Sequence, residues 1–403
     1  MRRIDLSNFR VARSETARDI NRRIVLNMIR RHQPISRAGL ARRSGLQRST
    51  VSAITEQLFS ERWVIEGALG HLPRGRKPTL LHLNPDRAGI VGIDIRSGTT
   101  NLAVAGVDSN FMAQECMSTG TDAAEFVSRL TRRVTDLMRA HPMDSYEGIG
   151  VSLPGRVDAT SHRLVFAPNL GWNDLDLKTP LEQATGLPVQ LENAANVCAL
   201  AELWSGRHGE RVSNLLAVTV SEGIGVGIIL NGQLLHGATG MAGEFGHVCL
   251  EPEGPQCRCG NRGCWEVMAS NSSATRYYAE SFSVRKGEVG SKSSMARVPF
   301  DDLLRLAEQG DERAAKALDR MAGYLGAGIA MLVTGLAPEV LMVIGEITRA
   351  WNRAGPIINE SVRRHCSTHA ATRILATDPD AQPRLRGTIA LVLQKHFGAP
   401  FLA

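Results

Sequence analysis

The sequence predicts an α/β protein, with a winged helix-turn-helix module at residues 1–83 followed by a two-lobed body at residues 84–403. The charge is uneven, since residues 1–86 carry 17 Lys and Arg against 7 Asp and Glu, while the remainder carries 30 against 33. Apolar residues repeat at helical spacing in the first 60 positions, and two short apolar runs follow them. Further on, strands, then helices, then more strands suit two α/β lobes with a cleft between them.

Length and composition place the chain among ordinary globular proteins. Its 403 residues are enough for two or three domains, and 43% hydrophobic with 22% charged residues is typical of a soluble protein. No apolar run reaches membrane-spanning length, and residues 1–31 carry arginines where a signal peptide would have an apolar core. The odd number of seven cysteines suits a reducing compartment. We therefore expect a cytoplasmic protein that does not use a membrane.

Three helices are expected in the basic module. Residues 21–31 have an apolar stripe with arginines on the other side. Ser36 can cap a short second helix at residues 37–43. After a turn at residues 44–46, residues 47–58 form a third helix with its own apolar stripe. This order is that of a helix-turn-helix motif, although similar patterns occur in proteins that never bind DNA.

The charge makes double-stranded DNA the expected partner of this module. Short or donor-bearing side chains stand at the start of the third helix, as contact with base edges and phosphates requires. Two strands, at residues 63–65 and 79–83, enclose a basic loop whose tip could enter a minor groove or contact phosphates only. The predicted DNA-binding residues are Arg37, Gln47, Arg48, Ser49, Thr50, Ser52, Arg74, Arg76 and Lys77.

One histidine and three cysteines lie within eighteen residues of the body. They are His247, Cys257, Cys259 and Cys264. Zn²⁺ takes four nitrogen or sulfur ligands, and a closed set of four is structural rather than catalytic. Gly260 and Gly263 allow the loop to turn back tightly. A disulfide or a set of buried free thiols is the alternative, but the clustering of four potential ligands favours zinc as the cofactor.

Residues 243–247 and 257–266 resemble the signature of the ROK family of repressors and sugar kinases, Glu-x-Gly-His followed by Cys-x-Cys-Gly-x-x-Gly-Cys-x-Glu. The resemblance implies an actin-like, ribonuclease-H-like ATPase fold and zinc on the four ligands above. It also implies a sugar site that uses Asn193, Glu244, His247 and Glu266. The two carboxylates could instead be kept for the loop alone. The N-terminal module is similar to those of ROK regulators of the NagC, Mlc and XylR type, whereas ROK kinases lack it.

Four positions depart from the pattern of the ROK kinases. Arg96 stands two residues after Asp94, where the kinases have a glycine that lets phosphates approach the backbone. Ala194 replaces the aspartate that acts as general base, and alanine cannot accept a proton. Glu222 puts a negative charge in the second phosphate loop. Only Gly345 is left of the adenosine-side glycines. We therefore predict that the chain is not an enzyme.

These observations predict a transcriptional repressor of sugar-utilisation genes that binds a palindromic operator as a homodimer or homotetramer, with a sugar as effector. A bifunctional sugar kinase is one alternative. The other is a repressor controlled by docking of a partner such as a sugar-transport protein, with a vestigial sugar site. Arg96 could meet an effector's phosphate or fill an empty nucleotide pocket. Residues 270–298 are expected to be irregular, and residues 301–336 helical.

Overall fold

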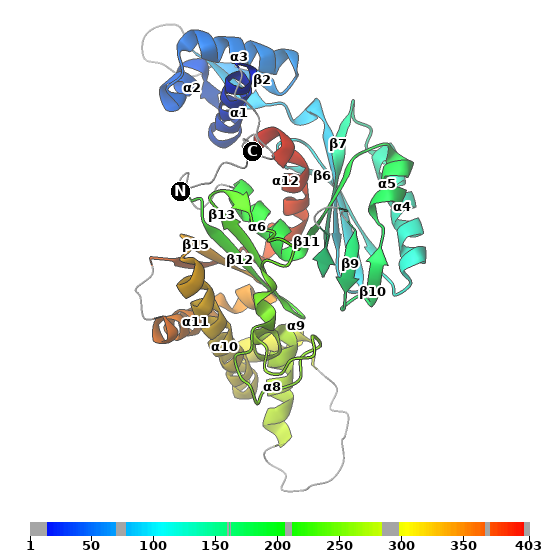
Figure 1. Ribbon diagram of the computed structural model, residues 1–403, viewed down its shortest axis with the longest axis vertical. Helices are drawn as coiled ribbons and strands as arrows, with labels where there is room; N and C mark the ends of the chain where they lie inside the picture. Colours follow the sequence, from blue (N-terminus) through cyan, green and yellow to red (C-terminus); the bar gives the residue numbers. More distant parts are fainter. Residues whose placement is uncertain are drawn as a thin grey trace. The chain divides into compact units, whose positions relative to one another are not determined.

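The computed structural model describes residues 14–69, 78–158, 161, 163–205, 212–283, 298–366 and 371–398. The chain forms two compact units (Figure 1). Unit 1 comprises Met1–Val151, Leu177–Gln190 and Thr388–Ala403, and unit 2 comprises Ser152–Asp176 and Leu191–Gly387. The boundary between residues 83 and 84 stays a prediction. None of the helices in the described ranges is long and apolar enough to span a membrane.

The N-terminal module has three helices and a small sheet in the order β1-β3-β2. Its elements are α1 (Ser14–His32), β1 (Ile35–Ser36), α2 (Arg37–Ser44), α3 (Arg48–Ser60), β2 (Val64–Leu69) and β3 (Thr79–Leu83). Ser36 caps α2 by accepting a hydrogen bond from the Gly39 amide at 3.1 Å, as predicted. Val51, Ile54 and Leu58 of α3 are buried, which confirms the predicted apolar stripe.

Within unit 1, the module packs against the C-terminal part of α12 (Pro383–Phe397). The Trp63 ring is 1% exposed and makes edge contacts with the rings of His396 and Phe397, at centroid distances of 4.6 and 5.6 Å. The Arg87 guanidinium lies over that ring, 3.8 Å from its centroid, and pairs with Glu147. Buried aromatic contacts of this kind stabilise the packing of the module in unit 1.

The first five-stranded sheet has the order β11-β7-β4-β5-β6. Its strands are β4 (Gly89–Ile95), β5 (Thr99–Ala105), β6 (Phe111–Ser118), β7 (Tyr146–Leu153) and β11 (Val189–Asn193). Every residue of β4 is buried, and β4 pairs antiparallel with β5. The helices α4 (Ala123–Ala140) and α5 (Lys178–Thr185) belong to unit 1.

The second five-stranded sheet lies in unit 2 and has the order β14-β13-β12-β15-β16. Its strands are β12 (Leu215–Val220), β13 (Ile224–Leu230), β14 (Gln233–Leu234), β15 (Val340–Gly345) and β16 (Arg373–Ala376). β12 pairs antiparallel with β13 and parallel with β15. A smaller sheet joins β8 (Arg156–Val157), β9 (Leu164–Ala167) and β10 (Trp172–Leu175) in the order β10-β9-β8.

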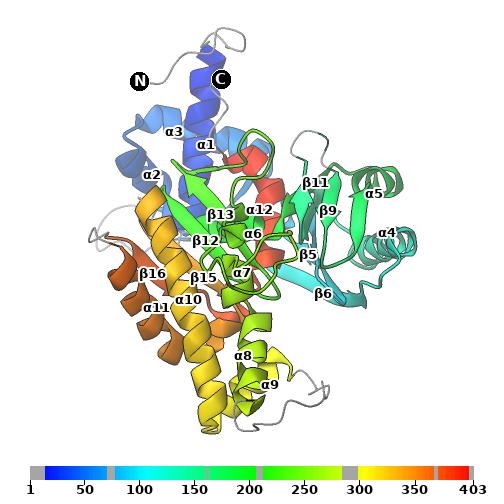
Figure 2. The same ribbon diagram turned by 60° about the horizontal axis from the view of Figure 1, so that its bottom comes forward.

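Helices pack on this second sheet around one hydrophobic core. They include α7 (Trp265–Ala269), α8 (Asn271–Ser283), α9 (Phe300–Glu308), α10 (Glu312–Leu336) and α11 (Trp351–His365). The helix α6 (Ala194–Ser205) packs against β12 and β13 of the same sheet. The long helix α10 runs alongside α11 (Figure 2). The helices α9 and α10 confirm the helical prediction for residues 301–336.

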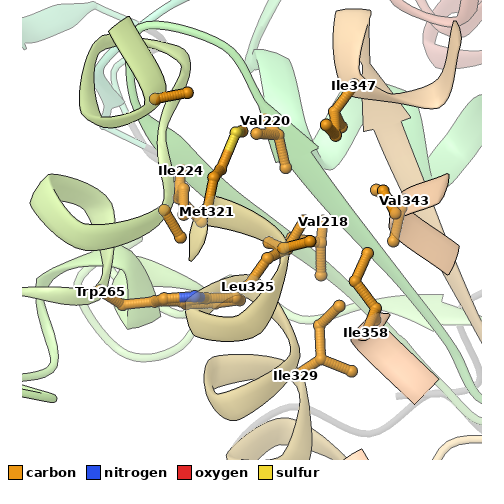
Figure 3. Packing of buried hydrophobic residues seen from close by; sticks show 14 of the residues in the cluster. Val218, Val220, Ile224, Trp265, Met321, Leu325, Ile329, Val343, Ile347 and Ile358 are labelled. Carbon is orange, nitrogen blue, oxygen red and sulfur yellow. The ribbon is translucent and has the colours of Figure 1, made fainter. Parts of the chain in front are cut away.

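Trp265 anchors α7 to α10 in this core. Its side chain is fully buried beside Leu325 and Met321 (Figure 3), and its indole N–H donates to the backbone carbonyl of Tyr324 at 3.1 Å. The ring lies against Gly328, where a Cβ would come within 2.0 Å of it. Any side chain at position 328 would therefore displace the indole.

The prediction that residues 270–298 are irregular was wrong for its first half, because residues 271–283 form α8. Ala274, Tyr277 and Tyr278 are buried at helical spacing, and the Tyr277 hydroxyl donates to the Met268 carbonyl at 2.8 Å. The polar composition of this segment hid the three buried positions. Residues 284–297 lie outside the described residues.

Candidate metal centre and adjoining ligand site

The histidine and three cysteines of the signature converge on one point in unit 2. Their ligand atoms all lie within 4.8 Å of one another, and the group is His247, Cys257, Cys259 and Cys264. The Sγ atoms of Cys259 and Cys264 are 3.6 Å apart, and Cys257 Sγ lies 3.7 Å from His247 Nδ1. Two sulfurs bound tetrahedrally to one Zn²⁺ would lie about 3.8 Å apart. The four residues therefore fit one zinc-sized cation, and the sulfurs are too far apart for a disulfide.

The loop that carries the cysteines has the turns that the glycines were expected to allow. Gly260 and Gly263 have φ angles of +97° and +60°, and a Cβ on Gly263 would lie 1.5 Å from the Glu251 carbonyl oxygen. The Cys257 amide donates to the Asn261 carbonyl at 2.7 Å. Side chains other than hydrogen are strained or excluded at these turns, so the loop geometry depends on glycine.

Two of the three thiols in this group have raised pKa values. Burial, followed by hydrogen bonds with Cys259 and Cys257, raises the pKa of the Cys264 thiol to about 12. Burial also raises the pKa of Cys257. Thiolates, not thiols, bind metals, so a divalent cation would bind here with release of protons. The remaining cysteine of this stretch, Cys249, is exposed and lies outside the group.

The two nitrogens of His247 face different groups. Nδ1 faces Cys257, and Nε2 lies 3.7 Å from a carboxylate oxygen of Glu244. A metal on Nδ1 would leave the ring proton on Nε2, where it can be donated to a carboxylate or a hydroxyl. The His247 imidazole could therefore bind a metal through Nδ1 and a sugar hydroxyl through Nε2.

Glu266 lies between the metal group and the start of β13. Its Oε2 accepts a hydrogen bond from the Ile224 amide at 3.1 Å, and a Cβ on Gly223 would lie 2.5 Å from the same oxygen. Burial raises the pKa of Glu266, whereas the Ile224 hydrogen bond and the charges of His247 and Arg258 oppose this rise. One carboxylate oxygen is thus fixed by the backbone beside the three thiols.

Asn193 lies at the end of β11 and links two segments. Its amide nitrogen donates to the Gly155 carbonyl at 2.7 Å, and its oxygen accepts from the Ala195 amide at 2.8 Å. The preceding residue, Glu192, is buried and accepts hydrogen bonds from the Asn196 side chain at 2.9 Å and from His236 at 2.7 Å. Sequence reasoning missed the pair of Glu192 and His236, because nothing in the sequence signals it.

Three of the four segments that depart from the kinase pattern carry a carboxylate that is hydrogen-bonded to a neighbouring side chain, namely Asp94, Glu222 and Glu346. Arg96 donates to the buried Asp94 at 2.6 Å in unit 1. In unit 2, Ser272 donates to Glu222 at 2.6 Å, and Asn271 donates to Glu346 at 2.9 Å. Asn271 and Ser272 are the first two residues of α8. The carboxylates at these altered positions are therefore held by hydrogen bonds within the chain.

The predicted DNA-binding residues differ in their surroundings. Gln47, Arg48, Ser49 and Ser52 are exposed at the start of α3, and Thr50 is half-buried. Arg37 pairs with Glu56 at 3.1 Å and with Glu66 at 3.2 Å, so its guanidinium is engaged within the module. Three further predicted residues lie outside the described residues, namely Arg74, Arg76 and Lys77.

The fold and this cysteine-rich loop define a class of protein. Residues 90–395 match the ROK family, and the chain belongs to that family. Its fold is the actin-like ROK fold preceded by a winged helix-turn-helix module, as predicted.

The chain resembles a regulator over nearly its whole length. It is 28% identical to the xylose repressor of Bacillus subtilis over 90% of this chain and 91% of that protein. A solved ROK family transcriptional regulator, a homologue of the Escherichia coli MLC protein, is 25% identical. It covers 95% of this chain and 98% of its own with a TM-score of 0.79. The ROK glucokinase from Streptomyces griseus, solved with glucose and AMPPNP, is 28% identical. All of that enzyme matches 76% of this chain, with a TM-score of 0.67.

Proposed function

We propose that this chain is a DNA-binding transcriptional repressor of sugar-utilisation genes whose operator binding is controlled by a sugar. The observation that carries this proposal is the presence of a winged helix-turn-helix module on a ROK body. The matched glucokinase is contained whole within 76% of this chain, which leaves about a quarter with no counterpart in that enzyme. The xylose repressor of Bacillus subtilis matches 90% of the chain.

The operator contacts are assigned to α3 and to the basic loop between β2 and β3. The exposed start of α3 presents Gln47, Arg48 and Ser49, which suit the major groove. A homodimer or homotetramer would place two such helices on a palindromic operator. Arg37 would have to leave Glu56 and Glu66 to bind a phosphate, so we expect it to contribute less than Arg48.

The effector site is assigned to Asn193, Glu244, His247 and Glu266. Carboxylate oxygens accept hydrogen bonds from sugar hydroxyls, and the Nε2 proton of His247 can be donated to one. A structural zinc, when bound, supplies a fixed tetrahedral anchor for the loop. The backbone bond from Ile224 to Glu266 then holds that carboxylate in one orientation.

We propose that the chain does not transfer phosphate. Ala194, the first residue of α6, has no group that accepts a proton from a sugar hydroxyl. The carboxylates of Glu222 and Glu346 would repel the phosphates of a nucleotide, and each is held by a residue of α8. These features support a regulator over a bifunctional kinase.

A thermal-shift screen tests the effector assignment. The zinc-loaded protein is heated with hexoses, pentoses, N-acetylhexosamines, their 6-phosphates and ATP, because a ligand that binds only the folded state raises the midpoint. We expect a shift with one sugar and none with ATP. A shift with ATP would contradict the absence of kinase activity, and silence from every sugar would favour a protein partner as the inducer.

Operator binding is tested with a palindromic duplex that the protein selects from a random library. The Arg48→Ala variant should bind this duplex about tenfold more weakly, since one arginine contact to a base or phosphate is worth about 1–3 kcal/mol. The control is Arg139→Ala, which removes an equal charge from α4. Equal losses in the two variants would show that net charge, not the α3 contact, decides binding.

A further inference from the structure

No ion pair with a carboxylate is found for Arg156 or Arg258 of unit 2 among the residues that the structure describes. Other arginines of this unit are paired, for example Arg163 with Asp174 and Asp176. Arg156 is half-buried, its Nε is shielded from water without a hydrogen-bond partner, and its Nη1 reaches only the Met241 sulfur at 3.6 Å. Arg258 is exposed, and it donates to the neutral side chain of Asn169 at 2.7 Å.

Arg258 adjoins the candidate ligand site. It stands between the metal-ligand candidates Cys257 and Cys259, and its charge interacts with the Glu266 carboxylate. Its guanidinium is therefore close to one of the groups assigned to sugar hydroxyls.

Arg156 adjoins the same site from another side. It follows Gly155, whose carbonyl accepts the hydrogen bond from Asn193. Its other neighbour, Met241, has a backbone carbonyl that accepts from the Glu244 amide at 3.4 Å. Arg156 is thus joined to the segments that carry two of the four assigned sugar-binding residues.

The small sheet brings the two arginines into one neighbourhood. Arg156 of β8 pairs with Phe166 of β9. Asn169, the partner of Arg258, lies in the turn that joins Ala167 of β9 to Trp172 of β10. Both arginines are therefore attached to β9 and the turn that follows it.

This arrangement suits an anion. A guanidinium presents a planar fork of donors that matches a carboxylate or a phosphate, and a shielded Nε without an acceptor is unfavourable. A neutral sugar would bring no negatively charged acceptor to these two guanidinium groups. An anion cannot lie against Glu244 and Glu266, which repel it, so charge places it on the arginine side and the hydroxyls on the carboxylate side.

We propose that the effector is an acidic sugar, whose carboxylate or phosphate binds Arg156 and Arg258 while its hydroxyls bind Glu244, His247 and Glu266. This inference rests on the proposed sugar-binding function of the site. Arg96 is a poorer candidate for the anion, because its Nε already donates to Asp94 at 2.6 Å.

The test is calorimetric titration of the full-length, zinc-loaded chain with matched sets of ligands. Each set contains a neutral sugar, its acid and its phosphate, such as glucose, glucuronate and glucose 6-phosphate, or xylose, xylonate and xylose 5-phosphate. We expect one anionic ligand to bind at least tenfold more tightly than its neutral parent. The member that binds distinguishes a carboxylate from a phosphate.

The variants Arg156→Gln and Arg258→Gln should each weaken binding of that anionic ligand at least tenfold and leave the affinity for the neutral parent within twofold. The control is Arg262→Gln, an exposed arginine in the same loop. Metal content and melting temperature show that each variant is folded.

Three outcomes overturn the inference. The first is that the neutral parent sugar binds as tightly as its anionic relatives. This result would overturn the inference but leave the proposed sugar-binding function intact. Equal losses for neutral and anionic ligands in the arginine variants would show that the arginines only position the loop. If no sugar of either kind binds, the proposed function fails together with the inference.

Discussion

Two groups of acidic side chains in this chain have opposite surroundings. One group lies in the three segments that were compared with the phosphate- and adenosine-side loops of the ROK kinases. There each carboxylate accepts a hydrogen bond from a nearby side chain: Asp94 from Arg96, Glu222 from Ser272 and Glu346 from Asn271. The other group adjoins the candidate metal ligands. There Glu244 is exposed and faces His247 at 3.7 Å, and Glu266 has one oxygen bound by a backbone amide.

Under the proposed function, this difference is the one expected between a nucleotide site that has been lost and a sugar site that has been kept. Asp94, Glu222 and Glu346 each accept a hydrogen bond of 2.6 to 2.9 Å from a side chain of the same chain. Beside the metal group, carboxylates and an imidazole have capacity for further partners. The following experiments test this contrast.

Loss of the metal should have the largest effect. The double variant Cys257→Ser, Cys259→Ser removes two of four ligands, so bound zinc should fall from about one ion per chain to almost none. The melting temperature should fall on the order of 10 °C, because metal binding stabilises the folded loop. Zinc is measured by atomic absorption and unfolding by calorimetry. The control is Cys249→Ser at an exposed cysteine outside the group, and zinc retained in the double variant would exclude the proposed ligands.

Glu266→Gln should have the next largest effect, on sugar binding. The variant keeps the size of the side chain but removes the charge that strengthens a hydrogen bond from a hydroxyl, which is worth about 1.5–3 kcal/mol. Affinity for the effector should therefore fall about 10- to 100-fold by calorimetric titration. Glu253→Gln, an exposed glutamate in the same loop, is the matched control. Unchanged affinity in Glu266→Gln would mean that Glu266 serves the loop alone.

A smaller effect is expected on the pH dependence of stability. The hydrogen bond to Glu192 raises the pKa of His236 above the ordinary 6.5. A raised folded-state pKa means that the protonated imidazole stabilises the fold fully below pH 6.5, and that this stabilisation is lost as pH rises through the higher folded value. The melting temperature of His236→Gln should thus decline less than that of the natural chain as pH rises above 6.5.

The matched control for this effect is His365→Gln, since His365 donates to the Ser361 backbone carbonyl at 2.8 Å and not to a carboxylate. The same decline with pH in His236→Gln and in the natural chain would contradict the role of the pair with Glu192.

Restoring the general base alone is expected to have no effect on phosphate transfer. Ala194→Asp supplies a proton acceptor, which is worth about 10²–10⁴-fold in rate when the rest of a catalytic site is present. Glu222 and Glu346 remain, so a coupled assay with glucose and ATP should detect no ADP release above background. A ROK glucokinase serves as the positive control for the assay. Turnover by the single variant would show that the altered kinase positions still admit ATP.

Short-range features of the fold and site could be predicted from the sequence. The four metal ligands lie within eighteen residues, so their spacing alone restricts them to one neighbourhood. The Ser36 cap and the buried stripe of α3 follow from local rules of the same kind.

Features that join distant segments could not be predicted in this way. The pair of His236 and Glu192 spans 44 positions, and the contact of Arg258 with Asn169 spans 89. Such pairs depend on how the sheets and loops pack, which no local pattern encodes. The ion pairs of Arg37, a predicted DNA-binding residue, could not be predicted either, because its carboxylate partners lie on α3 and β2.

The burial of Trp265 would make the protein an optical reporter of a metal at the candidate site. The indole is joined through the main chain to Cys264, is fully buried, and donates a hydrogen bond to the Tyr324 carbonyl. A change in the position of Cys264 must move this ring relative to Gly328, where no free space remains. Among the five tryptophans of the chain, only Trp265 directly follows a metal-ligand candidate. The emission wavelength of the protein should therefore shift on zinc removal, without any attached dye.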